Sequence, residues 1–298
     1  MHTARWLIWL RNNVDGLVAL LLAFTVGVLA VVDVINDDAL NEAILLVLGL
    51  LATTLLRDRH LSAKAMRDAS SVRLLNGPEI GHALAMARRG TEQWVFKGGT
   101  GTYMRAVTLR ECVENARREQ RPLRIQIEVI DPSNEQLCKT YAQFRSSLAP
   151  ETSGSIEPWT TERTRREAFA TIFAACWYQQ RFTFLTIDVG LSAVMTTFRW
   201  DLSSSCVIVT QDNPNTPAML FERDKPYYRD YHRELVSSFN QTRQVELSRG
   251  LDSPLSDEPT VDQSRTLFDL LGLPLPTSFT DRDVADIVRR ALQPRNPY

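Results

Sequence analysis

Hydrophobic residues are concentrated at the N-terminal end of the chain, in two long runs without charge. The first, residues 16–32, predicts a helix over about residues 14–35, long enough to span a hydrocarbon core of about 30 Å. The second, residues 43–56, predicts a helix over about residues 41–57, although its length alone also fits a buried core helix. Together the two runs predict a transmembrane hairpin over residues 1–60.

Charged residues flank the two runs asymmetrically. The turn between them carries acidic side chains and no Lys or Arg, whereas Arg5 and Arg11 precede the first run and Arg57 and Arg59 follow the second. By the positive-inside rule, both termini and everything after the hairpin are cytoplasmic and the turn faces outward. A cleaved signal peptide is the alternative for the first run, and the second run so close behind it favours the hairpin.

Small residues recur on the first predicted membrane helix. Ala19, Ala23 and Gly27 are spaced four apart and share one face. Such a face allows close approach of a second helix in the bilayer. The neighbour is either the chain's own second helix or another copy, so a homo-oligomer is one of two expectations.

Beyond the hairpin, the pattern of apolar positions changes twice. Residues 61–76 keep an apolar stripe at helical spacing and predict a helical stalk, which Asn76-Gly77-Pro78 ends. Residues 77–249 then alternate between strand and helix patterns, which predicts a cytosolic α/β domain with a mixed sheet. A polar linker over 250–262 and short C-terminal helices within 263–298 complete the chain. The expected strands are 94–97, 123–130, 182–189, 194–200, 206–210 and 218–221, and the expected helices are 78–89, 104–118, 134–148, 161–180, 227–240, 264–271 and 281–292.

The charge balance and the cysteine spacing argue against nucleic-acid binding and against a zinc site. The 298 residues hold 34 Lys and Arg against 35 Asp and Glu, without the basic excess that phosphate-backbone binding favours, so no DNA or RNA polymer is expected as a partner. The four cysteines are far apart and form no C-x-x-C pair. We expect reduced core thiols, no metal site and no cofactor.

The sharpest local motif is FKGGTGTYMR at residues 96–105, and we call residues 98–101 the glycine loop. Glycines at a strand-to-helix junction allow a ligand close to the backbone and favour an anion at the helix start. Either this is a tight turn without a ligand or it contacts a phosphate. In the second case Arg105→Ala is expected to weaken anion binding without unfolding. The candidate residues here are Lys97, Gly98, Gly99, Thr100, Gly101 and Arg105.

Four further candidates follow other predicted elements. Asp131 ends a predicted strand, where ligands gather in α/β sheets, although an Asp-Pro turn is the structural alternative. Arg145 lies on the next helix, one turn after Tyr141. Arg199 and Asp201 share a strand face and either pair with each other or contact a ligand.

Catalytic motifs are missing from the sequence. No histidine is part of an H-x-K motif, and neither G-x-S-x-G nor H-E-x-x-H occurs, so we predict no catalytic residue. Arg163, Arg165 and Arg166 cluster on one helix. We interpret them as a solvated helix face, with phosphate capture as the alternative.

The segments WVFKGGTGTYMR, IQIEVIDPSNEQLCKTYAQFR and FRWDLSSSCVIVTQDNPNTPAML resemble the phospholipase D-like α/β domains of bacterial regulatory and defence proteins. The likeness covers about residues 90–245. It implies a phospholipase D-like fold without the H-x-K catalytic motif, hence a domain for sensing. With a two-helix hairpin, the chain is also similar to bacterial inner-membrane effectors of antiphage signalling, in which a nucleotide second messenger binds the soluble domain.

Three functional hypotheses follow. In the first, the protein is a membrane-anchored sensor or effector that binds a nucleotide-like or phosphate-bearing ligand. In the second, it is a membrane-bound enzyme acting on a phosphate-containing substrate, with Asp131 or Asp201 as the acid or base. In the third, it is a membrane scaffold that docks a partner protein through its C-terminal LFDLLGLPLP segment.

Overall fold

The computed structural model divides the chain into two compact units, Met1–Ser70 and Ser71–Tyr298. It describes residues 24–25, 45, 48–49, 51–62, 72–148, 157–211, 213 and 216–294. The second unit contains every candidate site residue.

The first unit contains a helix through residues 51–62, where the sequence predicts the end of the second membrane helix and the start of the stalk. Its leucines lie largely uncovered by protein, with Leu55 63% and Leu56 68% exposed. Among the described residues, no helix is both long enough and apolar enough to cross a membrane. The first predicted helix lies outside the described residues except for positions 24 and 25, so the hairpin stays a prediction.

The stalk prediction is wrong at its C-terminal end. Arg73–Leu75 is a strand, β1, that pairs antiparallel with β7 (Ala218–Glu222). Leu75 is buried whereas Leu74 is 61% exposed, which is the two-residue alternation of a strand. The predicted start of the next helix at Pro78 is confirmed, although a strand and not a helix precedes it.

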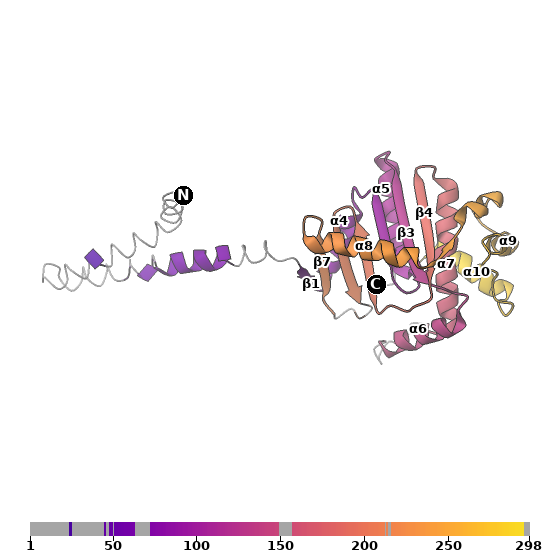
Figure 1. The fold of residues 1–298 in the computed structure, drawn as a ribbon, viewed down its shortest axis with the longest axis horizontal. Coiled ribbons are helices and arrows are strands. Elements are labelled where there is room, and N and C mark those ends of the chain that lie inside the picture. The colour runs from indigo at the N-terminus through magenta and orange to yellow at the C-terminus, as the bar shows by residue number, and fades with distance from the viewer. Residues whose placement is uncertain are drawn as a thin grey trace. The chain divides into compact units, whose positions relative to one another are not determined.

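The second unit is built on one mixed eight-stranded sheet, in the order β1-β7-β6-β5-β2-β3-β4-β8 (Figure 1). β2, β3 and β4 are parallel, and every other neighbouring pair is antiparallel. The predicted mixed-sheet α/β domain is therefore confirmed. Its remaining strands are β2 Gln93–Lys97, β3 Leu123–Ile130, β4 Leu185–Ser192, β5 Phe198–Ser203, β6 Cys206–Gln211 and β8 Arg243–Val245.

Helices cover both faces of this sheet. Helix α8 crosses one face, as Figure 1 shows, and buries Tyr228 and Leu235 against Val95 and Val207. Most of the other helices bury the larger core on the opposite face, which includes Trp94 and Phe96 of β2 with Phe169 and Phe173. Helix α6 instead buries Cys138 and Tyr141 with Ile130 in a smaller cluster. The helices are α4 Pro78–Arg88, the π-helix η1 Met104–Leu109, α5 Arg110–Arg118, α6 Glu135–Ser147, α7 Thr161–Arg181, α8 Pro226–Asn240, the 3-10 helix η2 Leu247–Asp252, α9 Val261–Leu270 and α10 Asp281–Leu292.

Two predicted strands are shifted along the chain. β4 and β5 begin three and four residues later than expected, at Leu185 and Phe198. Aromatic residues before β4 explain the first shift, since Phe182 ends α7 and its ring stacks on Tyr178 at 6.1 Å between centroids. Aromatic residues favour strands, but here Phe182 packs on the end of α7 and the strand begins after it.

The predicted linker over 250–262 packs onto the domain. Gln180 of α7 donates to the Gly250 carbonyl at 2.6 Å and accepts from the Leu255 N–H at 2.9 Å. Leu255 is buried, and Phe268 of α9 packs edge-on against Phe169. The C-terminal helices thus complete the same core. The apolar side chains of LFDLLGLPLP that a docking partner would need, Leu267, Phe268, Leu271 and Leu273, are buried within the protein.

Candidate functional site

The glycine loop continues the pairing of β2 with β3 and then starts a helix. The Gly98 N–H donates to the Glu128 carbonyl at 3.1 Å, and the Ile130 N–H donates to the Gly99 carbonyl at 3.0 Å. Gly101 has φ of 74°, a left-handed conformation that favours glycine. The loop's backbone is therefore held by the neighbouring strand end.

Protein side chains fill the space next to two of the glycines. A Cβ on Gly99 would lie 2.3 Å from the Tyr141 ring, and one on Gly98 would lie 3.2 Å from Cγ of Arg199. Tyr141 comes from α6 and Arg199 from β5, so two elements close over the loop. This close packing explains the glycines without a ligand and favours the tight-turn interpretation.

Asp131 lies at the same edge of the sheet, as its position after β3 predicts. Its carboxylate accepts from the Ser133 N–H at 2.8 Å, which forms an Asp-Pro turn, and pairs with Arg243 of β8 at 2.8 Å. The start of β5, which runs antiparallel to β2, brings Arg199 to this edge too. We call Gly98, Gly99, Asp131, Arg199 and Arg243 the strand-end site.

Arg199 and Asp201 form the structural pair that the sequence allowed. Arg199 Nε donates to Asp201 at 2.6 Å, and the indole N–H of Trp94 donates to the other carboxylate oxygen at 3.2 Å. The Asp201 side chain is fully buried, and the guanidinium of Arg199 lies over the Tyr103 ring. The pair is thus part of the core.

Lys97 and Arg145 point to other places. Lys97 Nζ donates to Ser238 of α8 at 2.6 Å and lies 3.6 Å from Glu128, on the sheet face that α8 covers. The guanidinium of Arg145 lies over the Trp159 ring, 4.8 Å from its centroid. Neither side chain therefore forms an anion site together with the glycine loop.

Arg105 is buried beneath the glycine loop. Its guanidinium pairs with Glu167 of α7 at 2.5 Å and donates to the carbonyls of Glu167 and Arg290 and to Thr171 Oγ1 at 2.8–2.9 Å. Burial lowers the Arg105 pKa, although Glu167 opposes this shift. Burial alone would raise the pKa of Glu167, but the ion pairs with Arg105 and Arg290 hold it below its ordinary value. Arg105 is accordingly a buried structural ion.

The ten predicted residues therefore do not form one site. The glycine loop, Asp131 and Arg199 lie at one sheet edge, whereas Lys97, Arg105 and Arg145 have partners elsewhere. Asp131 and Asp201, the two proposed acid or base groups, are each engaged in an ion pair. Burial raises the pKa of the Cys112, Cys138 and Cys176 thiols to about 12 and raises that of Cys206, so none is an activated nucleophile. In the described part of the chain, no cluster of His, Cys, Asp and Glu is placed to hold a metal ion.

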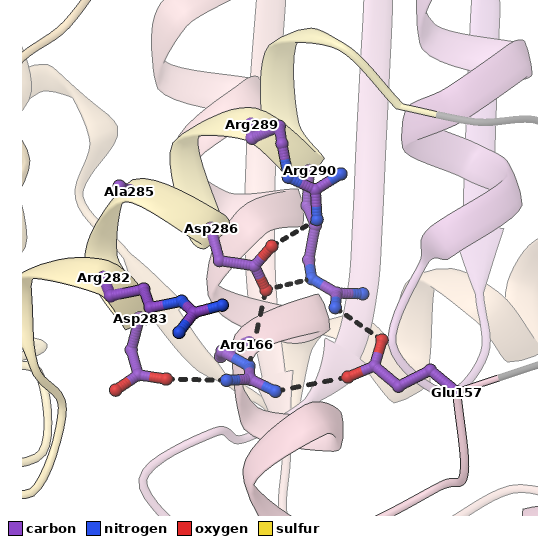
Figure 2. A pocket seen from close by; sticks show the side chains of 8 residues that line it. All are labelled: Glu157, Arg166, Arg282, Asp283, Ala285, Asp286, Arg289 and Arg290. Atoms are coloured by element: carbon purple, nitrogen blue, oxygen red, sulfur yellow. Dashed lines mark hydrogen bonds and ion pairs between the residues drawn. The ribbon is translucent and has the colours of Figure 1, made fainter.

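An open cleft of about 650 Å³ lies along α10, and none of the ten predicted residues lines it. Figure 2 shows its charged side chains linked by ion pairs. Arg166 of α7 contacts Asp283 at 2.6 Å and Glu157 at 3.3 Å, and Arg290 of α10 contacts Glu157 and Asp286, each at 2.6 Å. We call this the arginine cleft. Its lining residues are Glu157, Arg166, Arg282, Asp283, Ala285, Asp286, Arg289 and Arg290.

The interpretation of the α7 arginines as a solvated face is wrong. Arg163 lies over the Trp159 ring, and Arg165 donates to the Pro132 carbonyl at 2.9 Å. Arg166 is only 19% exposed and enters the arginine cleft. The arginine cluster itself is visible in the sequence, but its partners on α10 are more than 100 residues away.

Glu167 connects the arginine cleft with the glycine loop. One of its carboxylate oxygens pairs with Arg290 of the cleft, and the other pairs with Arg105 and accepts from Thr102 at 3.2 Å. Thr171, which also contacts Arg105, donates to the Thr100 carbonyl at 2.8 Å. The two regions therefore share one buried polar network.

Comparisons with known proteins give only distant structural likenesses. No protein-family model and no curated protein matches the sequence. The structure is similar to TrmBL2, an archaeal chromatin protein described with a novel mode of DNA binding, at 10% identity and a TM-score of 0.33, over 66% of this chain and 64% of that one. It is also similar to phosphatidylserine synthase from Haemophilus influenzae Rd KW20, at 11% identity and a TM-score of 0.35, over 59% of this chain and 39% of that one. The chain spans less than two thirds of either protein, and its assignment as a mixed-sheet α/β domain is based on its own strand order.

Proposed function

We propose that this protein is a membrane-anchored sensor or effector whose cytosolic α/β domain, of the phospholipase D-like kind without H-x-K, binds a nucleotide-like or phosphate-bearing ligand. Ligand binding is signalled to the membrane hairpin at the bacterial inner membrane, in antiphage signalling. The uncharged runs and the exposed leucines of residues 51–62 support the anchor.

The observation that carries this proposal is the excess of arginine around the open cleft. Four arginines and three carboxylates line it, so the lining residues carry one positive charge in excess. The buried Glu167, which also pairs with Arg290, is balanced by Arg105. Arginine presents five donors in a planar fork that matches phosphate oxygens. A cavity of about 650 Å³ is also within the usual size range of small-molecule sites, roughly 300–1,000 Å³.

The ion pairs of Asp131 and Asp201, the two proposed acid or base groups, favour a binding function over catalysis. A general acid or base must reach a substrate proton with a suitable pKa. Asp201 is fully buried and hydrogen-bonded on both oxygens, and Asp131 pairs with Arg243. An enzymatic function would require both pairs to open before the chemistry.

A thermal-shift screen of the full-length protein in detergent micelles tests ligand binding. The ligands are inorganic pyrophosphate and a panel of linear and cyclic nucleotides. A ligand at 100 times its dissociation constant stabilises the folded state by about 2.7 kcal/mol, which raises the melting temperature measurably. If no phosphate-bearing ligand shifts the melting temperature at low salt, the sensor proposal is wrong.

Accessible cysteines test the anchor. A cysteine at Asn36 or Asn41 is expected to react with a membrane-impermeant maleimide in intact cells, whereas a cysteine at Ser62 is not. The native thiols are all buried, so they give little background. The reverse labelling pattern would contradict the proposed topology.

A further inference from the structure

The carboxylate of Glu157 lies at the centre of the positive charge in the arginine cleft. It contacts Arg290 at 2.6 Å and Arg166 at 3.3 Å, as Figure 2 shows. Arg163 lies 3.8 Å from it, so three guanidinium groups converge on one side chain. Glu157 is 43% exposed, which leaves its carboxylate open to the cleft. This is the arrangement of a bound anion.

The other two carboxylates of the cleft are fixed by their own helix. Asp283 is part of the capping box of α10, where it accepts from the Thr280 N–H and hydroxyl, and the hydroxyl bond lowers its pKa. Asp286 pairs with Arg290 one turn along α10. Glu157 instead precedes α7 in a stretch without helix or strand, so the carboxylate that can leave with least disturbance is that of Glu157.

One arginine of the cleft, Arg282, takes part in none of these ion pairs. Among the described residues, no carboxylate is within ion-pair distance of Arg282, and no dashed line reaches it in Figure 2. Its position on the first turn of α10 places it on the cleft lining beside Asp283. A second negative charge in the cleft would find a partner there.

We propose that Glu157 occupies the position of a ligand phosphate and that a dianionic phosphomonoester or pyrophosphate group replaces it on Arg166 and Arg290, with Arg282 as an added contact. This inference rests on the proposed function and names its site and ligand class. Replacing a carboxylate by a monoanion leaves the charge of the cleft unchanged, whereas a dianion adds one negative charge to a cleft with one positive charge in excess. The cleft therefore favours a terminal phosphate over a phosphodiester.

Two probes of similar size test the ligand class. Adenosine 5′-monophosphate carries a phosphomonoester, and 3′,5′-cyclic adenosine monophosphate carries a monoanionic diester. Calorimetric titration of full-length protein in phosphatidylcholine nanodiscs is expected to show tighter binding of the monoester, by about two- to fivefold, which is what one exposed charge contact contributes. Equal affinities, or tighter binding of the cyclic nucleotide, would overturn the ligand class.

Two substitutions test the site. Glu157→Gln removes the competing charge and is expected to tighten monoester binding about fivefold. The control Glu162→Gln removes a charge from the exposed first turn of α7 and is expected to change the affinity for the monoester less than twofold. Arg282→Gln is expected to weaken binding about two- to fivefold, while Arg233→Gln, which removes an arginine that is 79% exposed on α8, leaves it unchanged.

The outcomes separate this inference from the proposed function. If the monoester binds wild type but Glu157→Gln and Arg282→Gln change nothing, the ligand enters elsewhere and the arginine cleft is the wrong site, although the sensor proposal survives. If neither wild type nor Glu157→Gln binds any phosphate-bearing probe, both are wrong. Adding phosphatidic acid to the nanodiscs shows whether the phosphate of the ligand belongs to a lipid or to a soluble molecule, since a lipid headgroup in the cleft would compete with the soluble monoester.

Discussion

Replacing Arg105 by alanine removes the guanidinium that links the glycine loop to α7. The side chain is 2% exposed, and that of its partner Glu167 is 4% exposed. Removing one member of a buried ion pair leaves the other desolvated, which destabilises proteins by about 3–5 kcal/mol. Arg290 still contacts Glu167 in the variant, so the lower half of this range is expected.

For a domain of this size, a loss of about 3–4 kcal/mol lowers the melting temperature by roughly 6–16 °C. The assay is thermal unfolding of the full-length protein in detergent, followed by near-UV circular dichroism. Arg124→Ala is the matched control, because Arg124 pairs with Asp188 at 2.9 Å but is 70% exposed. Its loss is expected to cost no more than about 1 kcal/mol. If Arg105→Ala unfolds at the same temperature as Arg124→Ala, Arg105 is not the buried structural ion described above.

Three further predictions concern packing, pH and thiols. Gly99→Val is expected to destabilise the domain by about 1–3 kcal/mol or more, because its Cβ would overlap the Tyr141 ring, whereas Gly81→Ala, with no atom within 4 Å of the added Cβ, is tolerated in a denaturant titration. The pKa values of Glu167 and Asp286 are depressed in the folded protein, so their stabilisation is complete above their ordinary values of 4.5 and 3.8 and is lost as pH falls further. The melting temperature should therefore stay nearly level between pH 6 and 8 and drop below about pH 4.5, and a level profile down to pH 3 would contradict those pairs. All four thiols should resist a disulfide reagent at neutral pH until the protein unfolds, and rapid labelling of the native protein would show that they are accessible.

Elements with strong local signals could be predicted from the sequence to the residue. β3 has the predicted bounds Leu123–Ile130, because its apolar residues alternate, and α10 has the predicted bounds Asp281–Leu292. Asn134 caps α6 through a side-chain bond to the Leu137 N–H, which is a role that asparagine favours. The three-residue strand β1 could not be predicted, since its strand identity depends on pairing with β7, more than 140 residues later.

Part of the strand-end site could be located from the sequence, whereas the roles of its residues and the arginine cleft could not. The strand order confirms that Asp131, Arg199 and the glycine loop lie at one edge of the sheet. The role of Arg105 depends on Glu167, 62 residues away, and no local pattern shows that α7 places a carboxylate there. The arginine cleft likewise requires α7 and α10 to pack together, which tertiary structure alone reveals.

Phosphorus NMR of adenosine 5′-monophosphate mixed with the full-length protein in nanodiscs tests the central claim most directly. It reports binding and turnover in one sample, since binding broadens the ligand resonance and hydrolysis adds a resonance of inorganic phosphate. The account predicts broadening that increases in Glu157→Gln and decreases in Arg282→Gln, with no new resonance over hours. An unbroadened resonance with wild type and Glu157→Gln, or a growing signal of inorganic phosphate, would contradict a binding protein without catalysis.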